Sequence, residues 1–214
     1  MTINSTTLLA HFGLTPESLP KLADGTAYVA VPLPHAVSGE SLDASEQQRA
    51  MAYGNRTTAQ QFIASRVLLR AVLSHYLCCA PETIAYTLQM HGKPILAAPH
   101  SGQLHFSLSR RDSWCAIALS RHQPVGVDIE QMRELPEMDD IAALYFSTQE
   151  CKALNQLHGS TKQRRFFELW TTLEAMSKRL GSGLKEAALN VGINQDARVS
   201  LDCLNTKWLV AVAS

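Results

Sequence analysis

The chain lacks an excess of charge of either sign. Its 214 residues carry 19 lysines and arginines against 19 aspartates and glutamates, so its formal net charge is zero. A dedicated nucleic-acid-binding protein is expected to carry a strong basic excess. We therefore expect no nucleic-acid partner, although balanced overall charge still permits a local basic patch that binds a small anion.

Cysteine is scarce and shows no metal-binding pattern. There are five cysteines, an odd number, and Cys78 and Cys79 are adjacent. No CxxC motif or Cys/His pair at ligand spacing occurs, which argues against a disulfide framework and against a zinc site. Reduced thiols, as in a cytosolic protein, are the simpler interpretation.

Long apolar runs are also missing. No run reaches the roughly 18 residues that a membrane helix needs. The N-terminal segment MTINSTTLLAHFGL has no basic region ahead of an apolar stretch, so it does not resemble a signal peptide. We therefore expect a cytoplasmic protein with no membrane partner. The apolar fraction of 46% is enough for a hydrophobic core.

Two long helical patterns organise the chain. One runs from 45 to 77 and the other from 162 to 180, where Gly181 and Gly183 follow as glycines commonly do at a helix end. Shorter helices are expected at 138–145 and 147–157. Strands are expected at 27–33, 84–89, 104–108, 114–120, 124–130, 189–193, 198–201 and 207–213.

The order of these elements predicts an internal repeat. A strand, a long helix and further strands occur once before Arg121 and once after it. We therefore expect an α/β (α+β) fold of two pseudo-symmetric halves, residues 1–120 and 121–214, each a small sheet packed with a long helix. No sequence identity between the halves is visible, so this prediction depends on element order alone.

Asp128 and Glu130 form the first candidate site. They lie two residues apart in PVGVDIE, where Val125, Val127 and Ile129 alternate with them, so a strand would place both carboxylates on one face. That face must meet water, a metal or a cation. An acidic pair at a strand end is more often solvated surface, but Gly126 indicates a close backbone approach.

Glu174 and Lys178 form the second candidate site. They are four residues apart in a helical pattern and share a face with Trp170, one turn earlier. A Glu followed by Lys at this spacing is usually only a helix-surface pair, worth about 0.2–0.5 kcal/mol. The tryptophan favours a lined groove instead. Together with Asp128 and Glu130, Glu174 could contribute to an oxygen-rich site for a hard cation such as Mg²⁺, with a lysine beside it.

Basic residues follow the strand at 104–108. Ser109, Arg110 and Arg111 would place a hydroxyl and two guanidiniums at one edge, and arginine presents a fork suited to phosphate oxygens. A solvated basic loop is an equally good explanation of these residues alone. Lys93, in the turn Gly92-Lys93-Pro94, could likewise be an ordinary solvated lysine.

The order of the motifs is similar to that of the Sfp-type 4′-phosphopantetheinyl transferases. The family pattern is GKP, a Phe-Asn-Leu-Ser-His-Ser loop, Gly-Val-Asp-Ile-Glu, Phe-x-x-x-Glu, then Trp-x-x-Lys-Glu-Ala-x-x-Lys-x-x-Gly. The matching segments here are GKP, FSLSRRDSW, VGVDIE, FSTQE and FFELWTTLEAMSKRLGSGL. Each motif alone is weak, but all of them in order, across roughly 56–184, are specific.

This resemblance implies a two-lobed fold with coenzyme A in the cleft between the halves. It implies transfer of 4′-phosphopantetheine from coenzyme A to a serine of an apo acyl or peptidyl carrier protein, which leaves adenosine 3′,5′-bisphosphate.

The resemblance also implies roles for individual residues. The family's Mg²⁺-binding acids match Asp128, Glu130 and Glu174, and Glu174 also matches the proposed base for the carrier serine. The lysine that contacts the pyrophosphate matches Lys178. The remaining coenzyme A contacts match Lys93, Ser109, Arg110 and, with a less certain alignment, Arg56.

Several positions depart from the family pattern. Leu173 stands where the family has a lysine before the catalytic glutamate, which removes a cation. Arg110 replaces the loop histidine and keeps a positive charge, Ser107 replaces an asparagine, and Arg111 replaces the second serine. We expect an active enzyme, because the acids and Lys178 remain. The alternative is a non-catalytic module that binds coenzyme A or a carrier protein.

The surface that would receive the carrier protein lies, on this hypothesis, between Gln131 and Phe146. That stretch holds Glu134, Glu137, Asp139 and Asp140, which argues against docking of an acidic partner along its whole length. Because two halves within one chain could supply an interface that relatives make by oligomerising, we expect a monomer.

Overall fold

A computed structural model of the protein describes residues 4–22, 25–190 and 198–214. The helices are α1 (Ser5–Ala10), α2 (Ala44–Met51), α3 (Arg56–Leu77), α4 (Met138–Tyr145), α5 (Thr148–Asn155), α6 (Gly159–Leu180) and α7 (Leu184–Asn190). The strands are β1 (Thr26–Pro32), β2 (Tyr86–Leu88), β3 (Pro94–Leu96), β4 (His105–Arg111), β5 (Trp114–Ser120), β6 (Gly126–Gln131), β7 (Val199–Asn205) and β8 (Trp208–Ala213). Short 3₁₀ turns cover Pro16–Ser18, Pro81–Thr83 and Met90–Gly92.

Two three-stranded sheets repeat the same topology. The first has the order β1-β5-β4 and the second the order β6-β8-β7, and every neighbouring pair is antiparallel. In each sheet the first strand is followed by a 22-residue helix, α3 or α6, before the last two strands of the sheet. The predicted fold class, in which each half combines a small sheet with a long helix, is confirmed. Beside these sheets, β2 and β3 form a two-stranded hairpin.

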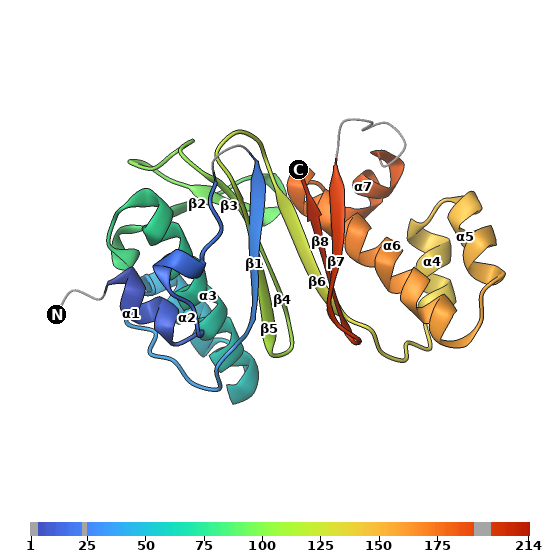
Figure 1. The fold of residues 1–214 in the computed structure, drawn as a ribbon, viewed down its shortest axis with the longest axis horizontal. Coiled ribbons are helices and arrows are strands. Elements are labelled where there is room, and N and C mark those ends of the chain that lie inside the picture. Colours follow the sequence, from blue (N-terminus) through green and yellow to red (C-terminus); the bar gives the residue numbers. More distant parts are fainter. Residues whose placement is uncertain (1–3, 23–24, 191–197) are drawn as a thin grey trace.

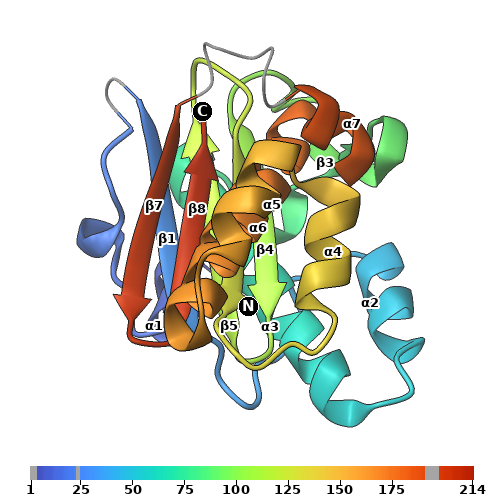
Figure 2. The ribbon, with the colours of Figure 1, turned by 90° about the vertical axis from the view of Figure 1, so that its right-hand side faces the viewer.

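The two sheets lie in the middle of the molecule, with α1–α3 on one outer side and α4–α7 on the other (Figure 1). Seen from the side of the second half, α6 crosses the face of the sheet that contains β8 (Figure 2). The layers are therefore helix, sheet, sheet and helix. This arrangement buries both faces of strands β5, β6 and β8, whereas most of strand β7 is exposed.

Alternation along the central strands shows how both faces are covered. On β5, Ala116 and Ala118 pack toward the second sheet, whereas Ile117 and Leu119 join the cluster around α3. On β8, Val210 and Val212 pack between the sheets, and Ala211 and Ala213 pack near Ala175 of α6. Successive residues of a strand face opposite ways. A strand that is buried on both faces therefore needs a continuous run of apolar residues.

Gly126 lets α6 approach β6 closely. A Cβ atom on this residue would overlap the carbonyl oxygen of Ala175 and the backbone nitrogen of Arg179, two groups of α6. Both are backbone atoms, so no side-chain rotation could relieve the overlap. The close approach that the sequence predicted at Gly126 is thus confirmed, and it brings the α6 residues Glu174 and Lys178 to the strand that carries Asp128.

We expect Gly126→Ala to destabilise the protein and to reduce its activity together. The added methyl group must push α6 away from β6, and overpacking of this kind costs about 1–3 kcal/mol. The measurement is urea unfolding, with Gly54→Ala as the control, because a Cβ at Gly54 meets no atom within 4 Å. Equal stability of the two variants would contradict the close contact.

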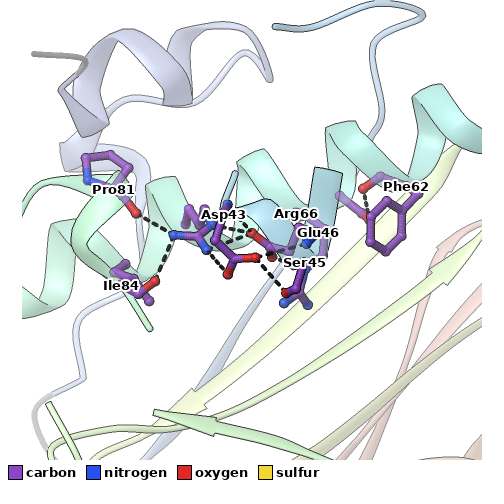
Figure 3. A network of polar contacts seen from close by, with 9 residues as sticks. Asp43, Ser45, Glu46, Phe62, Arg66, Pro81 and Ile84 are labelled. Atoms are coloured by element: carbon purple, nitrogen blue, oxygen red, sulfur yellow. Dashed lines mark hydrogen bonds and ion pairs between the residues drawn. The ribbon is translucent and has the colours of Figure 1, made fainter. Parts of the chain in front are cut away.

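A buried ion network fixes α2 against α3 (Figure 3). Arg70, on α3, is fully buried and donates to Glu46 Oε2 at 2.7 Å and to Asp43 Oδ2 at 2.8 Å. It also donates to the carbonyl oxygens of Pro81 and Ile84, at 2.9 and 2.8 Å. One guanidinium therefore links α2, α3 and the 3₁₀ turn that follows α3.

Several details differ from the sequence predictions. The helical pattern at 45–77 is two helices, because Asn55 adopts an extended conformation and caps the start of α3 by accepting from the Thr58 amide. The strand predicted at 189–193 is wrong for Leu189 and Asn190, which end α7; 191–193 lie outside the described residues. The apolar run was too short to separate strand from helix. Helix α1 and strand β3 were not predicted.

No helix within the described ranges is both long enough and apolar enough to cross a membrane.

Candidate functional site

Asp128 is the centre of a buried polar cluster on the face of β6 that meets α6, with the end of β4 beside it. Its side chain is 5% exposed, and Oδ1 accepts from Ser109 Oγ at 2.8 Å and from Lys178 Nζ at 2.6 Å. The other oxygen, Oδ2, is buried and has no hydrogen-bond partner among the described residues. A buried carboxylate oxygen without a donor is costly, so this atom is a natural position for a cation.

Glu130 lies two residues further along β6 and contacts two arginines. Arg111 Nε is 3.4 Å and Arg133 Nη1 is 3.5 Å from Glu130 Oε2. Burial is the main cause that raises the pKa of Glu130, and the nearby charge of Asp128 raises it further. The face that carries Asp128 and Glu130 therefore meets cations, which was one of the predicted possibilities.

Glu174 and Lys178 enter the same cluster from α6. Lys178 Nζ bonds Asp128, lies 2.9 Å from Ser109 Oγ and is 3.9 Å from Glu174 Oε2. Burial raises the pKa of Glu174 and the charge of Asp128 raises it further, whereas Lys178 opposes both effects. The pair is therefore part of the site rather than an isolated helix-surface pair.

The end of β4 lies beside β6 and presents a polar row to it. Alternate residues of β4 share a face. Ser107 Oγ accepts from the Val127 amide at 3.1 Å, Ser109 bonds Asp128, and Arg111 contacts Glu130. The row connects the first sheet to the second at the acids.

A cavity of about 680 Å³ opens beside this cluster. Lys178 and Ser177 of α6 line one part of it, together with Arg110 and Lys93 of the first half. Its other lining residues include the aromatic side chains Tyr53, Phe62, Tyr86 and Phe106 and the basic side chains Arg49 and Arg66. The volume lies within the range of typical ligand pockets.

Arg49 and Arg66 supply positive charge to this cavity and were missed by the sequence analysis. The guanidinium of Arg66 lies 4.9 Å from the centre of the Tyr86 ring, and Nε bonds Glu46 Oε1 at 2.6 Å. Arg49 lies 5.5 Å from the centre of the Phe62 ring. Both residues lie in the helical pattern predicted at 45–77, and nothing in that pattern indicated that their side chains would face a cavity.

Of the predicted coenzyme A contacts, Lys93, Arg110 and Lys178 line the cavity. Neither Ser109 nor Arg56 is among the described residues that line it. Arg110 lines it while Nη1 donates to Gln61 Oε1 at 3.1 Å. Arg56 is the first residue of α3, is exposed, and is not among the described residues that line the cavity.

Lys93 has a role that its turn position did not predict. Its Nζ donates to the carbonyl oxygens of Val125, at 3.2 Å, and Arg179, at 2.9 Å. It thus links the loop before β3 to the start of β6 and to the end of α6. Burial, with a smaller contribution from Arg179, lowers the pKa of Lys93 to about 8.

Leu173 and Trp170 face the helices rather than the acids. Leu173 is buried and lines a small cavity of about 190 Å³ with Tyr145, Phe146 and Leu169. Trp170 stacks on Phe166, with ring centres 6.3 Å apart, and meets Tyr145 edge-on at 5.6 Å. The predicted groove lined by Trp170 is therefore wrong, because its ring packs in the cluster of α4, α5 and α6.

In the part of the chain that the structure describes, no group of three or more acidic, histidine or cysteine side chains is gathered closely enough to hold a metal ion. Each acid instead lies near a basic side chain, as the contacts of Asp128, Glu130 and Glu174 show.

Comparison with known proteins identifies the family. Residues 124–208 match the 4′-phosphopantetheinyl transferase superfamily, and residues 34–122 match the family described as "4′-phosphopantetheinyl transferase, N-terminal". The 4′-phosphopantetheinyl transferase HetI of Nostoc sp. is 30% identical over 185 residues, which cover 83% of this chain and 78% of HetI.

Two further relatives agree. A 4′-phosphopantetheinyl transferase of Bacillus subtilis is 26% identical over 164 residues, covering 76% of this chain and 71% of that protein. The protein slr0495 of Synechocystis sp. is 30% identical over 154 residues, covering 72% of this chain and 61% of that protein. The alignments thus span 61% to 78% of these relatives. The chain belongs to the 4′-phosphopantetheinyl transferase family, and the Sfp-type membership predicted from the order of its motifs is confirmed.

Proposed function

We propose that this protein transfers 4′-phosphopantetheine from coenzyme A to a serine of an apo acyl or peptidyl carrier protein. The observation that carries the proposal is the position of Lys178, which lines the large cavity and also bonds Asp128. A ligand in that cavity would therefore reach the acidic cluster. The transferases named among the relatives support the same reaction.

The cavity suits coenzyme A in its charge and its aromatic walls. Arg49, Arg66 and Arg110 offer guanidiniums to phosphate oxygens, and the aromatic side chains offer faces for a base to stack on. On this proposal the adenosine end lies among the aromatic residues, and the diphosphate lies near Lys178.

The chemistry of the three acids fits Mg²⁺, although the described structure does not gather three such side chains closely enough to hold the ion. Asp128, Glu130 and Glu174 are all carboxylates, the ligands that a hard divalent cation prefers. The unpartnered Oδ2 of Asp128 is a buried acceptor that no described side chain satisfies. Burial, and after it the charge of Asp128, raises the pKa of both Glu130 and Glu174, as expected for carboxylates that lie near one another. We propose that these residues hold the ion, which when bound would neutralise charge on the diphosphate.

The protein's own residues perform the remaining steps. Glu174 accepts the proton of the carrier serine, and its raised pKa makes it a stronger base than an ordinary glutamate. The serine oxygen then bonds the β-phosphorus of coenzyme A, the bond from that phosphorus to the bridging oxygen breaks, and adenosine 3′,5′-bisphosphate leaves. Lys178 stabilises the negative charge that grows on the leaving group, and Ser109 holds Asp128 in place.

The two halves, 1–120 and 121–214, would provide this cleft within one chain. We therefore propose a monomer whose partners are coenzyme A and the apo carrier protein, with no nucleic acid and no membrane, in the cytoplasm. The supporting observation is that the acids of β6, Lys178 of α6 and the polar row of β4 meet within a single protomer.

The alternative is a non-catalytic module that binds coenzyme A or a carrier protein. Leu173, which faces an apolar cavity instead of supplying a cation, is the observation that favours it. Incubation with coenzyme A, Mg²⁺ and a panel of apo carrier proteins, followed by intact mass spectrometry, separates the two. A carrier that gains one phosphopantetheinyl group supports the enzyme, and binding of coenzyme A without any gain supports the module.

We expect coenzyme A to bind less tightly as the pH rises through about 8. The pKa of Lys93 lies near this value, so its ammonium group loses its charge there. Loss of one charge-assisted contact to phosphate weakens binding by up to about tenfold. Calorimetric titrations of coenzyme A between pH 7 and 9.5 measure this.

Lys93→Arg is the matched control, because a guanidinium stays charged throughout this range. Its affinity for coenzyme A should stay level where that of the natural protein falls. An equal fall in both proteins would exclude Lys93 as the cause.

A further inference from the structure

Every acid of the cluster already has a basic side chain beside it. Lys178 bonds Asp128 and lies 3.9 Å from Glu174, while Arg111 and Arg133 both lie within 3.5 Å of Glu130. The three carboxylates are thus matched by three basic groups. A divalent ion that entered alone would add two positive charges to a cluster that is already balanced.

Of the two arginines beside Glu130, Arg111 is the more firmly placed. It ends β4 and is the third member of the row that begins with Ser107 and Ser109, so the strand itself directs its side chain toward β6. Its Nε is buried and, among the described residues, has no hydrogen-bond acceptor within bonding geometry. It contacts Glu130 through charge at 3.4 Å and lies 3.9 Å from the exposed carboxylate of Asp112, so it can change partner without losing a hydrogen bond.

The buried Oδ2 of Asp128 is an acceptor that the basic side chains do not use. Asp128 is 3% exposed and Oδ2 has no partner in the described structure, so the cluster retains an acceptor for a cation that is not yet there. The basic side chains balance the total charge, but they leave this oxygen unsatisfied. A divalent ion can bind this oxygen only if the basic side chains move away from the acids in part.

We propose that Arg111 is the resident counter-ion of Glu130 and competes with the divalent cation, so that the metal binds tightly only together with a diphosphate ligand. The diphosphate supplies the negative charge that attracts the guanidinium of Arg111 and the ammonium of Lys178. The carboxylates are then released to the metal. This inference rests on the proposed function and assigns Arg111 as the residue that couples the two binding events.

The experiment measures binding of Mn²⁺, by the electron paramagnetic resonance signal of the free ion, with and without coenzyme A. A blank with coenzyme A and no protein corrects for chelation in solution. In the natural protein we expect coenzyme A to tighten Mn²⁺ binding by about tenfold, within the usual range of coupling between two sites. We expect Arg111→Ser to bind Mn²⁺ alone about tenfold more tightly than the natural protein, with little further gain from coenzyme A.

Two further variants make the result specific. Arg111→Lys keeps the charge and should behave as the natural protein does. Arg165→Ser removes an arginine that pairs with Glu168 at 3.3 Å, outside the acidic cluster, and should leave Mn²⁺ binding unchanged. Thermal unfolding of each variant confirms that it is folded before its binding is compared.

Equal Mn²⁺ affinity of Arg111→Ser and Arg165→Ser, in the absence of coenzyme A, would overturn the inference. So would tight Mn²⁺ binding to the natural protein alone. Either result leaves the proposed function standing if the same preparation converts an apo carrier to its holo form. Failure of Mn²⁺ to bind in any state would instead count against the metal site itself.

Discussion

Glu174→Gln is expected to lower the rate of holo-carrier formation by about 10²–10⁴-fold, the range for loss of a general base. The amide has nearly the same shape but cannot accept the serine proton. Coenzyme A should bind with much less change, because Lys178 and the arginines of the cavity remain. Initial rates by mass spectrometry and calorimetric titration of coenzyme A measure the two effects separately.

The same substitution should make the protein more stable at neutral pH. Burial and Asp128 raise the pKa of Glu174 in the folded state, so the folded state favours the protonated acid. Stability from this group is therefore present at low pH and is lost as the pH rises through the raised value. Glutamine removes that loss, so the gain in Tm should be larger at pH 8 than at pH 4.

Glu168→Gln is the matched control for both effects. Glu168 lies on the same helix and pairs with Arg164 at 3.0 Å, but it lies outside the acidic cluster. It should leave transfer unchanged and should not raise Tm. Near-normal transfer by Glu174→Gln would remove Glu174 from the role of base, and a lower Tm would contradict the electrostatic account of the cluster.

Asp128→Asn should abolish transfer as well, for a different reason. The amide keeps a hydrogen-bond acceptor for Ser109, but it removes the negative charge that Lys178 contacts at 2.6 Å and that would hold the metal. Asp128→Asn should therefore also lose Mn²⁺ binding in the presence of coenzyme A, whereas Glu174→Gln should only weaken it.

Arg70→Met is expected to have the largest effect on the fold, a loss of about 3–5 kcal/mol in the free energy of unfolding. Methionine fills similar space but removes one of the two arginines that pair with the buried carboxylate of Glu46, so that Arg66 alone faces its charge. The carbonyl oxygens of Pro81 and Ile84 also lose their donor. Urea unfolding monitored by circular dichroism measures the loss.

A second substitution tests whether the charge of Glu46 is the cause of the stability lost in Arg70→Met. Adding Glu46→Gln to Arg70→Met removes that charge and should recover part of the lost stability. Arg165→Met, which breaks only an exposed pair with Glu168, should change stability by about 0.5 kcal/mol or less. A loss in Arg70→Met no larger than that of Arg165→Met would contradict the role of the buried network.

Much of the fold could be predicted because the strands and long helices carry strong local patterns. The alternation of Val125, Val127 and Ile129 with Asp128 and Glu130 predicted strand β6 and the shared face of its acids, and the structure has both. Gly181 adopts a left-handed conformation at the end of α6, as its position in the pattern predicted. Element order alone predicted the repeat that the two sheets share.

The contacts between the halves could not be predicted, because they join residues far apart in the sequence. Lys178 meets Ser109 across 69 positions, and Lys93 meets Arg179 across 86. No local pattern carries such a pairing. Arg111 was predicted to lie at a strand edge with Ser109, whose strand face it shares at a spacing of two residues, but its contact with Glu130 was not predicted. The groove expected at Trp170 was wrong because apolar neighbours from α4 cover that face of α6.

The central claim is that the acidic cluster and the cavity beside it form one transferase site. The most direct test incubates the protein with coenzyme A and an apo carrier protein, with Mg²⁺ or with excess chelator, and follows the intact mass of the carrier. The account predicts one phosphopantetheinyl group per carrier with Mg²⁺, an equal amount of adenosine 3′,5′-bisphosphate, and neither product with chelator. Glu174→Gln should form both products only at the strongly reduced rate given above. Unchanged carrier mass across a panel of apo carriers, from a protein that binds coenzyme A, would contradict it.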